Sequence, residues 1–203
     1  MRFLDRRLNR LPRPWGTVAS WLVTIALAVL VVLVFQAEVA KPFRIPSSSM
    51  EPTLHCARPS GGCEAQFSDR VLACEICLRF ASLKRGQIVV FHAPALAKQR
   101  CGEGGDYVKR LIGMPGDLVV EDDRGFISIN GRPLDEPYIT VADRASDVDF
   151  RGQSWRVPAH QYFMMGDNRG GSCDSRQWGA VPRSDLIGVV FATYWPPNRL
   201  SLR

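Results

Sequence analysis

The sequence predicts a mainly β domain that follows a single N-terminal transmembrane helix. Residues 14–37 contain no charged side chain, and residues 38–203 contain short β-rich segments between glycines and prolines, without a long 3.6-residue apolar repeat. The chain has 203 residues, of which 46% are hydrophobic and 23% are charged. This length and composition fit one compact domain with an anchor and exclude a multidomain assembly.

The charge-free run at residues 14–37 is long enough to cross a bilayer. Its 24 residues form a helix of about 36 Å, against a hydrocarbon core of about 30 Å. A cleaved signal peptide is the alternative, but its apolar region is usually shorter. No cut near residues 37–40 leaves small residues at both the minus-three and minus-one positions. We therefore expect a retained anchor.

Basic residues are concentrated before this run. Residues 1–13 hold five arginines and one aspartate, a net charge of +4 out of +6 for the whole chain. A basic tail favours the cytoplasmic side of the membrane. Charge gathered in a tail predicts contact with the lipid bilayer and argues against nucleic-acid binding. We expect a cytoplasmic tail (1–13), a transmembrane helix (14–37) and an extracytoplasmic domain (38–203) in the cell membrane.

The strand predictions rest on runs of β-branched and apolar residues. Turn-forming residues lie at both ends of each run. Seven segments have this pattern: residues 70–73, 87–91, 107–112, 117–121, 126–129, 162–165 and 186–194. Asn130 and Gly131 follow the fifth segment and predict a two-residue hairpin turn, because both positions of such a turn need positive φ. The polar stretch 141–153 is expected to be a surface excursion.

A serine-rich segment lies shortly after the anchor. Residues 46–54 read PSSSMEPTL, and Met50, Pro52 and Leu54 give the segment groups that pack and fix its backbone. A solvated serine-rich turn is the simpler alternative, but such a turn is usually followed by further polar residues. The segment therefore holds candidate nucleophiles for covalent catalysis.

The expected strand at 107–112 brings a lysine onto a partly apolar face. Alternation places Tyr107, Lys109 and Leu111 on one face, with Arg110 toward solvent. Desolvation on an inward face lowers the pKa of a lysine amine, and a neutral amine accepts a proton from a serine hydroxyl. The alternative is an ordinary solvated lysine beside an arginine. The residue types are thus compatible with a serine and lysine pair that attacks a carbonyl.

Other catalytic centres have less support in the sequence. His55, His92 and His160 lack the spacing of a metalloprotease, and no Gly-x-Ser-x-Gly segment supports a serine–histidine–aspartate triad. The segment 166–179, GDNRGGSCDSRQWG, is compatible with a salt-bridged turn or a calcium loop, but it lacks the closely spaced oxygen ligands of an EF-hand. We expect no metal and no cofactor.

Together, these segments resemble the bacterial type I signal peptidases, membrane-anchored serine proteases that remove signal peptides from exported proteins. The resemblance covers residues 42–195 through four ordered blocks, at 49–54, 69–72, 107–117 and 166–179. It implies a signal-peptidase/LexA-like β catalytic domain without a cofactor. It also implies that the substrates are signal peptides of secretory preproteins of the Ala-x-Ala type, which a monomer would cleave at the outer face of the membrane.

The resemblance implies catalytic roles for four residues. Ser49 would be the nucleophile and Lys109 the general base. The Ser47 hydroxyl and the Ser49 backbone N–H would form an oxyanion hole. Ser172 would hydrogen-bond the lysine amine and orient it.

Further residues of the four blocks would bind substrate or support the site. Asp174 and Arg176 would form a structural ion pair. The positions that would line shallow apolar pockets for small side chains are Phe43, Ile45, Leu54, Tyr107 and Val108. Plain core packing is the alternative for Phe43 and Ile45.

Three features depart from the family pattern. Ser48 occupies a position usually held by glycine, which affects the local backbone. Gly170 and Gly171 replace a common Asp-Asn pair, so we expect a more flexible loop before Ser172. The third departure is a longer insert at 55–68, which resembles some high-GC Gram-positive members.

The cysteines offer either metal ligands or disulfides. The six are Cys56, Cys63, Cys74, Cys77, Cys101 and Cys173. Only Cys74 and Cys77 have zinc-knuckle spacing, so a zinc site is the weaker alternative. Thiols outside the membrane oxidise, and we expect a disulfide between Cys56 and Cys63 in the insert. Cys74 and Cys77 are three apart on an expected strand, so they point to opposite faces and are not expected to pair.

Two rival functions remain open beside the membrane-anchored serine endopeptidase. The first is an autocleaving protease of the LexA type with the same serine and lysine chemistry, but such proteins have a DNA-binding or cytosolic N-terminal region where this chain has an apolar run. The second is a membrane-anchored, non-enzymatic metal or redox module that uses the cysteines. Metal content would separate this module from a protease.

Overall fold

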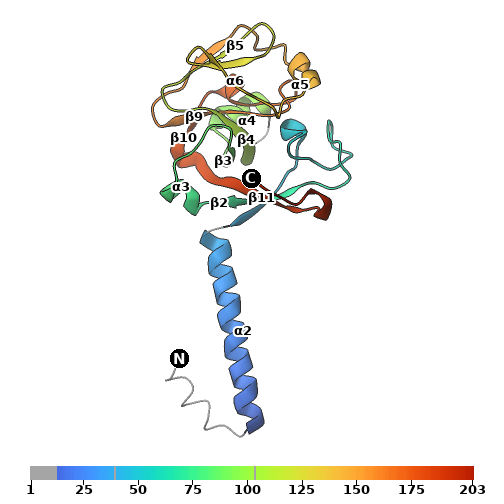
Figure 1. Cartoon of the computed structure of the whole chain (residues 1–203), viewed down its shortest axis with the longest axis vertical. Coiled ribbons are helices and arrows are strands. Elements are labelled where there is room, and N and C mark those ends of the chain that lie inside the picture. The colour runs from blue at the N-terminus through green and yellow to red at the C-terminus, as the bar shows by residue number, and fades with distance from the viewer. Residues whose placement is uncertain (1–12, 39, 103) are drawn as a thin grey trace. The chain divides into compact units, whose positions relative to one another are not determined.

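The computed structural model of the chain describes residues 13–38, 40–102 and 104–203, and the chain divides into two units after Ala40. In the first unit, helix α2 (Arg13–Glu38) covers the stretch predicted as helical, and most of its described side chains are exposed and apolar (Figure 1). Among the described residues, no helix reaches the length and apolarity that a membrane span needs. Residues 1–12 of the expected basic tail lie outside the described residues.

The second unit is built on a large antiparallel sheet. Its strand order is β1-β2-β11-β3-β4-β9-β10, and β12 also pairs with β11. The strands are β1 (Lys41–Arg44), β2 (Arg70–Cys74), β3 (Ile88–His92), β4 (Asp106–Gly113), β9 (Gln161–Met165), β10 (Val181–Pro182), β11 (Leu186–Trp195) and β12 (Ser201–Leu202). The order brings strands from both ends of the unit side by side in one layer.

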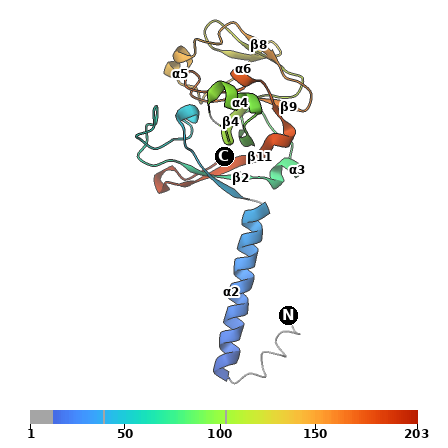
Figure 2. The ribbon, with the colours of Figure 1, turned by 180° about the vertical axis from the view of Figure 1, so that it is seen from behind.

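A smaller antiparallel sheet has the order β7-β6-β5-β8. Its strands are β5 (Leu118–Glu121), β6 (Ile127–Ile129), β7 (Arg132–Pro133) and β8 (Ser154–Arg156). Asn130 and Gly131, with φ of 52° and 79°, connect β6 to β7, so the predicted two-residue hairpin is confirmed. Figures 1 and 2 show the small sheet at one end of this unit and β2 and β11 at the other.

All seven predicted strand segments are confirmed, as β2, β3, β4, β5, β6, β9 and β11. The sequence analysis missed five strands, β1, β7, β8, β10 and β12, and every described helix of the second unit. These helices are α3 (Ile76–Phe80), α4 (Ala95–Cys101), α5 (Val141–Ser146) and α6 (Ser175–Trp178), with the 3₁₀ turns η1 (Ser48–Met50), η2 (Arg183–Asp185) and η3 (Pro197–Arg199). At most seven residues long, they are too short to show a 3.6-residue repeat.

Buried apolar side chains form three clusters that connect these elements. The first packs η1 and Leu54 against β2 and β11, the second joins α4 and α6 to β3 and β4 around Leu111, and the third packs β4 and β9 on the small sheet around Phe163. η1 packs into the first cluster, β4 packs into the second, and the two segments contact each other. Each segment therefore has its own packing in the core next to this contact.

The prediction that Cys74 and Cys77 do not pair is wrong. β2 ends at Cys74 and the chain turns into α3 at Ile76, so the two Cα atoms are 5.4 Å apart and the sulfurs form a disulfide. Three residues along a continuous strand would instead span roughly 10 Å. The misassignment of one turn as strand caused the error.

The other four cysteines also form disulfides. Cys56 and Cys63, the pair expected from the sequence, have Cα atoms 5.0 Å apart and close the insert on itself. Cys101 and Cys173, which the sequence analysis did not pair, join the end of α4 to the loop before α6 across 72 residues. With all six cysteines in disulfides, none is left as a thiolate for zinc.

Candidate active site

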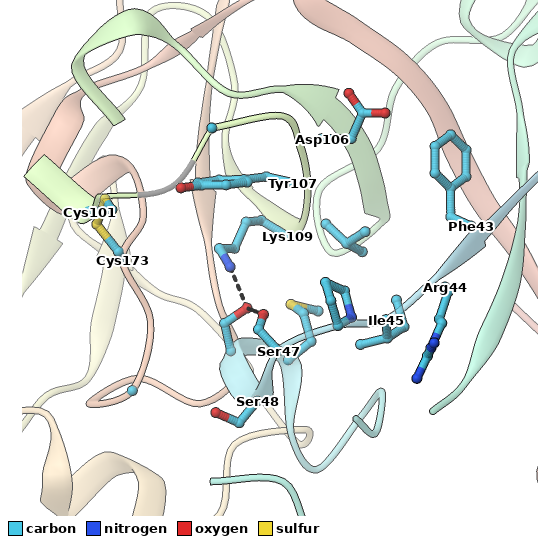
Figure 3. Close-up of a pocket in the computed structure, with 16 residues that line it drawn as sticks. Phe43, Arg44, Ile45, Ser47, Ser48, Cys101, Asp106, Tyr107, Lys109 and Cys173 are labelled. Atoms are coloured by element: carbon cyan, nitrogen blue, oxygen red, sulfur yellow. Dashed lines mark hydrogen bonds between the residues drawn. A yellow bond between two sulfur atoms is a disulfide. The ribbon is translucent and has the colours of Figure 1, made fainter. Parts of the chain in front are cut away.

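A cavity of about 410 Å³ lies between residues 43–50 and the first half of β4, residues 106–109 (Figure 3). Two sheet edges border it. In the described chain, β1 pairs only with β2, and residues 106–109 pair only with β3, because β9 joins β4 from Arg110 onward. Backbone groups on both edges can therefore bind an extended peptide.

The cavity holds a serine and a lysine in direct contact. Lys109 Nζ donates a hydrogen bond to Ser49 Oγ at 2.5 Å, and Ser47 Oγ lies 3.3 Å from the same oxygen (Figure 3). The Lys109 residue is only 4% exposed, and its amine lies 5.5 Å from the centre of the Tyr107 ring. The strand alternation that placed the lysine inward is confirmed. The 3₁₀ turn η1 presents Ser49 from the other side of the cavity.

Arg110 does not point to solvent as expected. It is 8% exposed, and its guanidinium donates two hydrogen bonds to Asp167, at 2.8 and 2.5 Å. The Tyr138 ring stacks 3.7 Å from the guanidinium carbon. Both faces of β4 are covered here, and a buried arginine needs such a bidentate carboxylate partner. The strand thus carries a catalytic candidate on one face and a structural ion pair on the other.

Asn168 holds the turn that carries Ser49, a role that the sequence analysis missed. Its backbone N–H donates to the Ser49 carbonyl oxygen at 3.2 Å, and its side-chain amide donates to the Ser48 carbonyl oxygen at 3.2 Å. The residue lies in the 166–179 block, whose density of turn formers was the available signal. Asn168 therefore fixes the position of the serine from a segment more than 100 residues away.

The expected hydrogen bond between Ser172 and Lys109 is absent. Ser172 Oγ is buried without a hydrogen-bond partner among the described residues, while the lysine amine points to Ser49. The hydroxyl faces Gly166, where an added Cβ would lie 2.2 Å from Ser172 Oγ and 2.4 Å from the Ser49 carbonyl oxygen. Gly166 thus allows the loop and the serine turn to approach each other closely.

The expected pair of Asp174 and Arg176 anchors this loop. Arg176 Nε donates to Asp174 Oδ1 at 2.9 Å, and the Gly166 N–H donates to Asp174 Oδ2 at 3.0 Å. Burial alone would raise the pKa of the Asp174 carboxyl, but the Arg176 guanidinium and the Gly166 hydrogen bond outweigh burial and hold the pKa below its ordinary value. The fully buried carboxylate therefore stays charged and ties both ends of the loop together.

A wider set of buried charges surrounds this pair. Arg176 also donates to Asp147 at 2.5 Å, so the stretch 141–153, expected to be a surface excursion, contributes a buried anchor. Glu121 is fully buried with its carboxylate 3.5 Å from Arg176. Burial, with added repulsion from Asp147, raises the pKa of Glu121 to about 7 despite the nearby guanidiniums of Arg176 and Arg169.

Gly170 and Gly171, the positions of the expected flexible loop, have close neighbours. A Cβ on Gly170 would lie 2.5 Å from Ser146 Oγ, and one on Gly171 would lie 2.6 Å from the Asn168 amide nitrogen. Both contacts are closer than side chains allow. The two glycines therefore give α5 and Asn168 room to approach the loop.

The insert 55–68 is attached to the serine turn. Glu51, two residues after Ser49, accepts hydrogen bonds from the backbone N–H groups of Cys56 and Glu64 at 3.1 and 3.4 Å. Ser48 is bound to the insert as well. Its hydroxyl donates a hydrogen bond to the Gly61 carbonyl oxygen at 3.2 Å. The position usually held by glycine is thus used as a tether to the insert.

The same region contains the cluster that comes nearest to a metal site among the described residues. Ligand atoms of Glu51, His55 and Glu64 lie within 4.8 Å of one another. Two donors on one tetrahedral zinc ion would be roughly 3.3 Å apart, given bonds of about 2.0 Å. The Glu51 carboxylate and the His55 imidazole lie closer than that and contact each other directly.

Four of the five expected substrate-binding residues line the cavity: Phe43, Ile45, Tyr107 and Val108. Leu54 does not, because it is fully buried in the core cluster beneath η1. The cavity also includes Asp106 and the Cys101–Cys173 disulfide, which the sequence analysis did not assign to the site. With a hydroxyl, an amine and two peptide-binding edges, this arrangement is suited to nucleophilic attack on a backbone carbonyl.

Comparison with known proteins identifies the family to which the chain is similar. The sequence pattern of the family described as "Signal peptidase, peptidase S26" matches residues 18–195. A signal peptidase I from Leptolyngbya laminosa is 36% identical over 93% of this chain and 85% of the relative. A probable signal peptidase I-2 from Synechocystis sp. is 38% identical over 88% of this chain and 74% of the relative. The chain also matches the crystal structure of a signal peptidase I from Enterococcus faecalis V583, with 32% sequence identity and a TM-score of 0.43. The matched region covers 53% of this chain and 96% of the other chain.

The raised pKa of Glu121 predicts a pH dependence of stability. Because the pKa is about 7 in the folded chain and about 4.5 ordinarily, the folded state binds more protons between these values, and stability should fall as pH rises through this window. The slope for one such group is at most about 1.4 kcal/mol per pH unit. Glu121→Gln cannot ionise and should have a flatter profile in thermal unfolding of the detergent-solubilised chain from pH 4.5 to 8. Parallel profiles for the two proteins would contradict the assignment.

Proposed function

The chain belongs to the signal peptidase family, peptidase S26, and we propose that it is a membrane-anchored serine endopeptidase that removes signal peptides from exported preproteins. The observation that carries this proposal is the 2.5 Å hydrogen bond between Lys109 Nζ and Ser49 Oγ in a cavity bordered by two sheet edges. The family membership supports the substrate class, and the geometry supports the roles of individual residues.

In the proposed reaction, Ser49 is the nucleophile and Lys109 the general base. The neutral amine accepts the hydroxyl proton while Ser49 Oγ bonds to the scissile carbonyl carbon. The protonated amine then gives its proton to the leaving amine, and an acyl-enzyme remains. A water molecule, deprotonated by the same amine, attacks the acyl-enzyme and restores the serine. One residue therefore carries the proton in both halves of the reaction.

The negative charge that develops on the carbonyl oxygen needs donors. We assign this role to the Ser47 hydroxyl, which lies 3.3 Å from Ser49 Oγ, and to the Ser49 backbone N–H. Such fixed donors are worth about 3 to 4 kcal/mol each in serine proteases. Asn168 binds the carbonyl groups of Ser48 and Ser49, so it orients this turn without contacting the substrate.

The substrate would bind as an extended segment between β1 and β4. Main-chain hydrogen bonds to the two edges would supply affinity that does not depend on the substrate's side chains. Phe43, Ile45, Tyr107 and Val108 give shallow apolar surfaces beside Ser49, which suit small side chains before the cut. This match supports a preference of the Ala-x-Ala type.

We also propose that residues 14–37 anchor the enzyme in the membrane. Residues 1–13 would then lie in the cytoplasm, and the second unit (residues 41–203), which we call the catalytic unit, would lie outside. The charge-free run and the net charge of +4 before it support this orientation. The exposed apolar side chains of α2 would contact lipid. The substrate would then meet the cavity as it leaves the bilayer.

Replacement of the two serines tests the catalytic assignment. Ser49→Ala should abolish cleavage of a preprotein with an Ala-x-Ala site, because no covalent intermediate can form. Ser47→Ala should retain activity reduced about 100- to 1000-fold through loss of one oxyanion donor. Cleavage by the detergent-solubilised chain is followed by gel mobility, with exposed Ser154→Ala as the matched control. Substantial cleavage by Ser49→Ala would overturn the assignment.

The pH profile tests the role of Lys109. Only a neutral amine accepts the serine proton, so kcat/KM should rise with pH along a limb that reports titration of this amine in the free enzyme. Lys109→Arg should be inactive, because arginine stays charged at every accessible pH. Lys84→Arg, an exposed position, serves as the control. If Lys109→Arg retained the wild-type rate, another group would have to be the base.

Protease accessibility tests the proposed orientation. Protease added to intact spheroplasts should digest the catalytic unit and spare a tag fused before residue 1, because the bilayer shields only the cytoplasmic side. Lysed spheroplasts are the control in which both parts are digested. Protection of residues 41–203 in intact spheroplasts would place the active site in the cytoplasm and revive the autocleaving alternative.

A further inference from the structure

The Cys101–Cys173 disulfide lines the active-site cavity. Figure 3 shows it beyond the lysine amine, on the opposite side of the cavity from Phe43 and Arg44. The Tyr107 ring lies between these two ends, above Lys109. Gly104 and Gly171 line the cavity together with the disulfide. These glycines lie three residues after Cys101 and two residues before Cys173, so the chain on both sides of the uncharged sulfur surface includes a lining residue without a side chain.

Lys109 lies between the two ends of the cavity in Figure 3, and Ser49 contacts it, so the serine and lysine pair has one arm of the cavity on each side. If residues before the scissile bond lie along Phe43, Ile45 and Val108, as the proposed function requires, the residues after the bond must leave past Ser49 in the other direction. An extended chain advances about 3.3 Å per residue, so the first residue after the cut meets the surface next to the serine and lysine pair. The described surface in that direction includes the disulfide.

The disulfide is a firm part of the cavity wall. Cys101 ends α4, and Cys173 directly precedes Asp174, whose buried carboxylate is fixed by Arg176 and the Gly166 N–H. Both cysteines pack against the second core cluster, the one around Leu111. A wall that is covalently closed and anchored on both sides cannot move aside for a bulky substrate group.

We infer that the Cys101–Cys173 disulfide forms the subsite for the first residue after the cut and limits the size of its side chain. The inference rests on the proposed function and adds a specificity determinant on the leaving-group side. Small uncharged side chains fit beside the two sulfurs and the glycines. Large side chains, such as that of tryptophan, collide with the disulfide and slow cleavage.

Two preproteins that differ only in the first residue after the cut, alanine or tryptophan, test this inference. The wild-type chain in detergent should cleave the alanine substrate with a kcat/KM on the order of 10-fold higher or more, since pocket fit is worth about 10- to 200-fold. Cys101→Ala/Cys173→Ala removes both sulfurs, and the ratio should fall toward 1. A ratio as large as that of the wild type would overturn the inference.

Two controls distinguish the loss of this disulfide wall from a general loosening of the active site. Cys74→Ala/Cys77→Ala removes another disulfide, which does not line this cavity, and should keep the wild-type ratio. Discrimination at the residue before the cut, alanine against valine, should stay unchanged in both double variants, because that residue lies in the other arm. A loss of discrimination in both arms would indicate a loosened site and would overturn the inference.

A second variant decides the case in which the double cysteine variant does not fold. Gly104→Leu narrows the same end without touching the disulfide, and an added Cβ there makes only ordinary contact with Lys98, at 3.7 Å. This variant should increase the ratio, and an unchanged ratio would overturn the inference. Failure of the wild type to cleave any preprotein would instead overturn the proposed function. Cleavage that requires Ser49, without discrimination after the cut, would overturn the inference alone.

Discussion

Burial of the Lys109 amine beside Ser49 is the constraint on which the rest of the site depends. An amine that is taken out of water loses much of its hydration and so must be held by its surroundings. β4 supplies the lysine from the part of the strand that pairs only with β3, and η1 supplies the serine from a turn. Asn168 and Gly166 then hold the serine turn against the loop that follows β9. The ion pair of Asp174 and Arg176 keeps this supporting loop in place.

Much of this arrangement could be predicted from the sequence, because it follows from local patterns. Alternating β-branched residues identified the main strands, and Asn130-Gly131 identified a hairpin. Strand alternation also placed Lys109 on an inward face. The resemblance to a family then paired it with Ser49, which no local pattern does, since 60 residues separate the two in the chain.

The remaining features depend on contacts between distant segments or on short turns. The burial of Arg110 requires Asp167, 57 residues later, and Asp147 becomes an anchor only because Arg176 lies opposite it. The pairing of Cys74 with Cys77 depends on where one strand ends, which propensity locates only to within a few residues. For Ser172, the family pattern suggested a bond that this chain does not form.

The bond between Cys101 and Cys173 closes a covalent ring around much of the catalytic unit. The ring contains β4, the whole small sheet and β9, whereas Ser49 lies outside it. A single break of the backbone anywhere between the two cysteines therefore leaves one molecule in which serine and lysine stay connected. An enzyme exposed to other proteases could be nicked in this region and persist as a two-chain form, which only reducing conditions would separate into fragments.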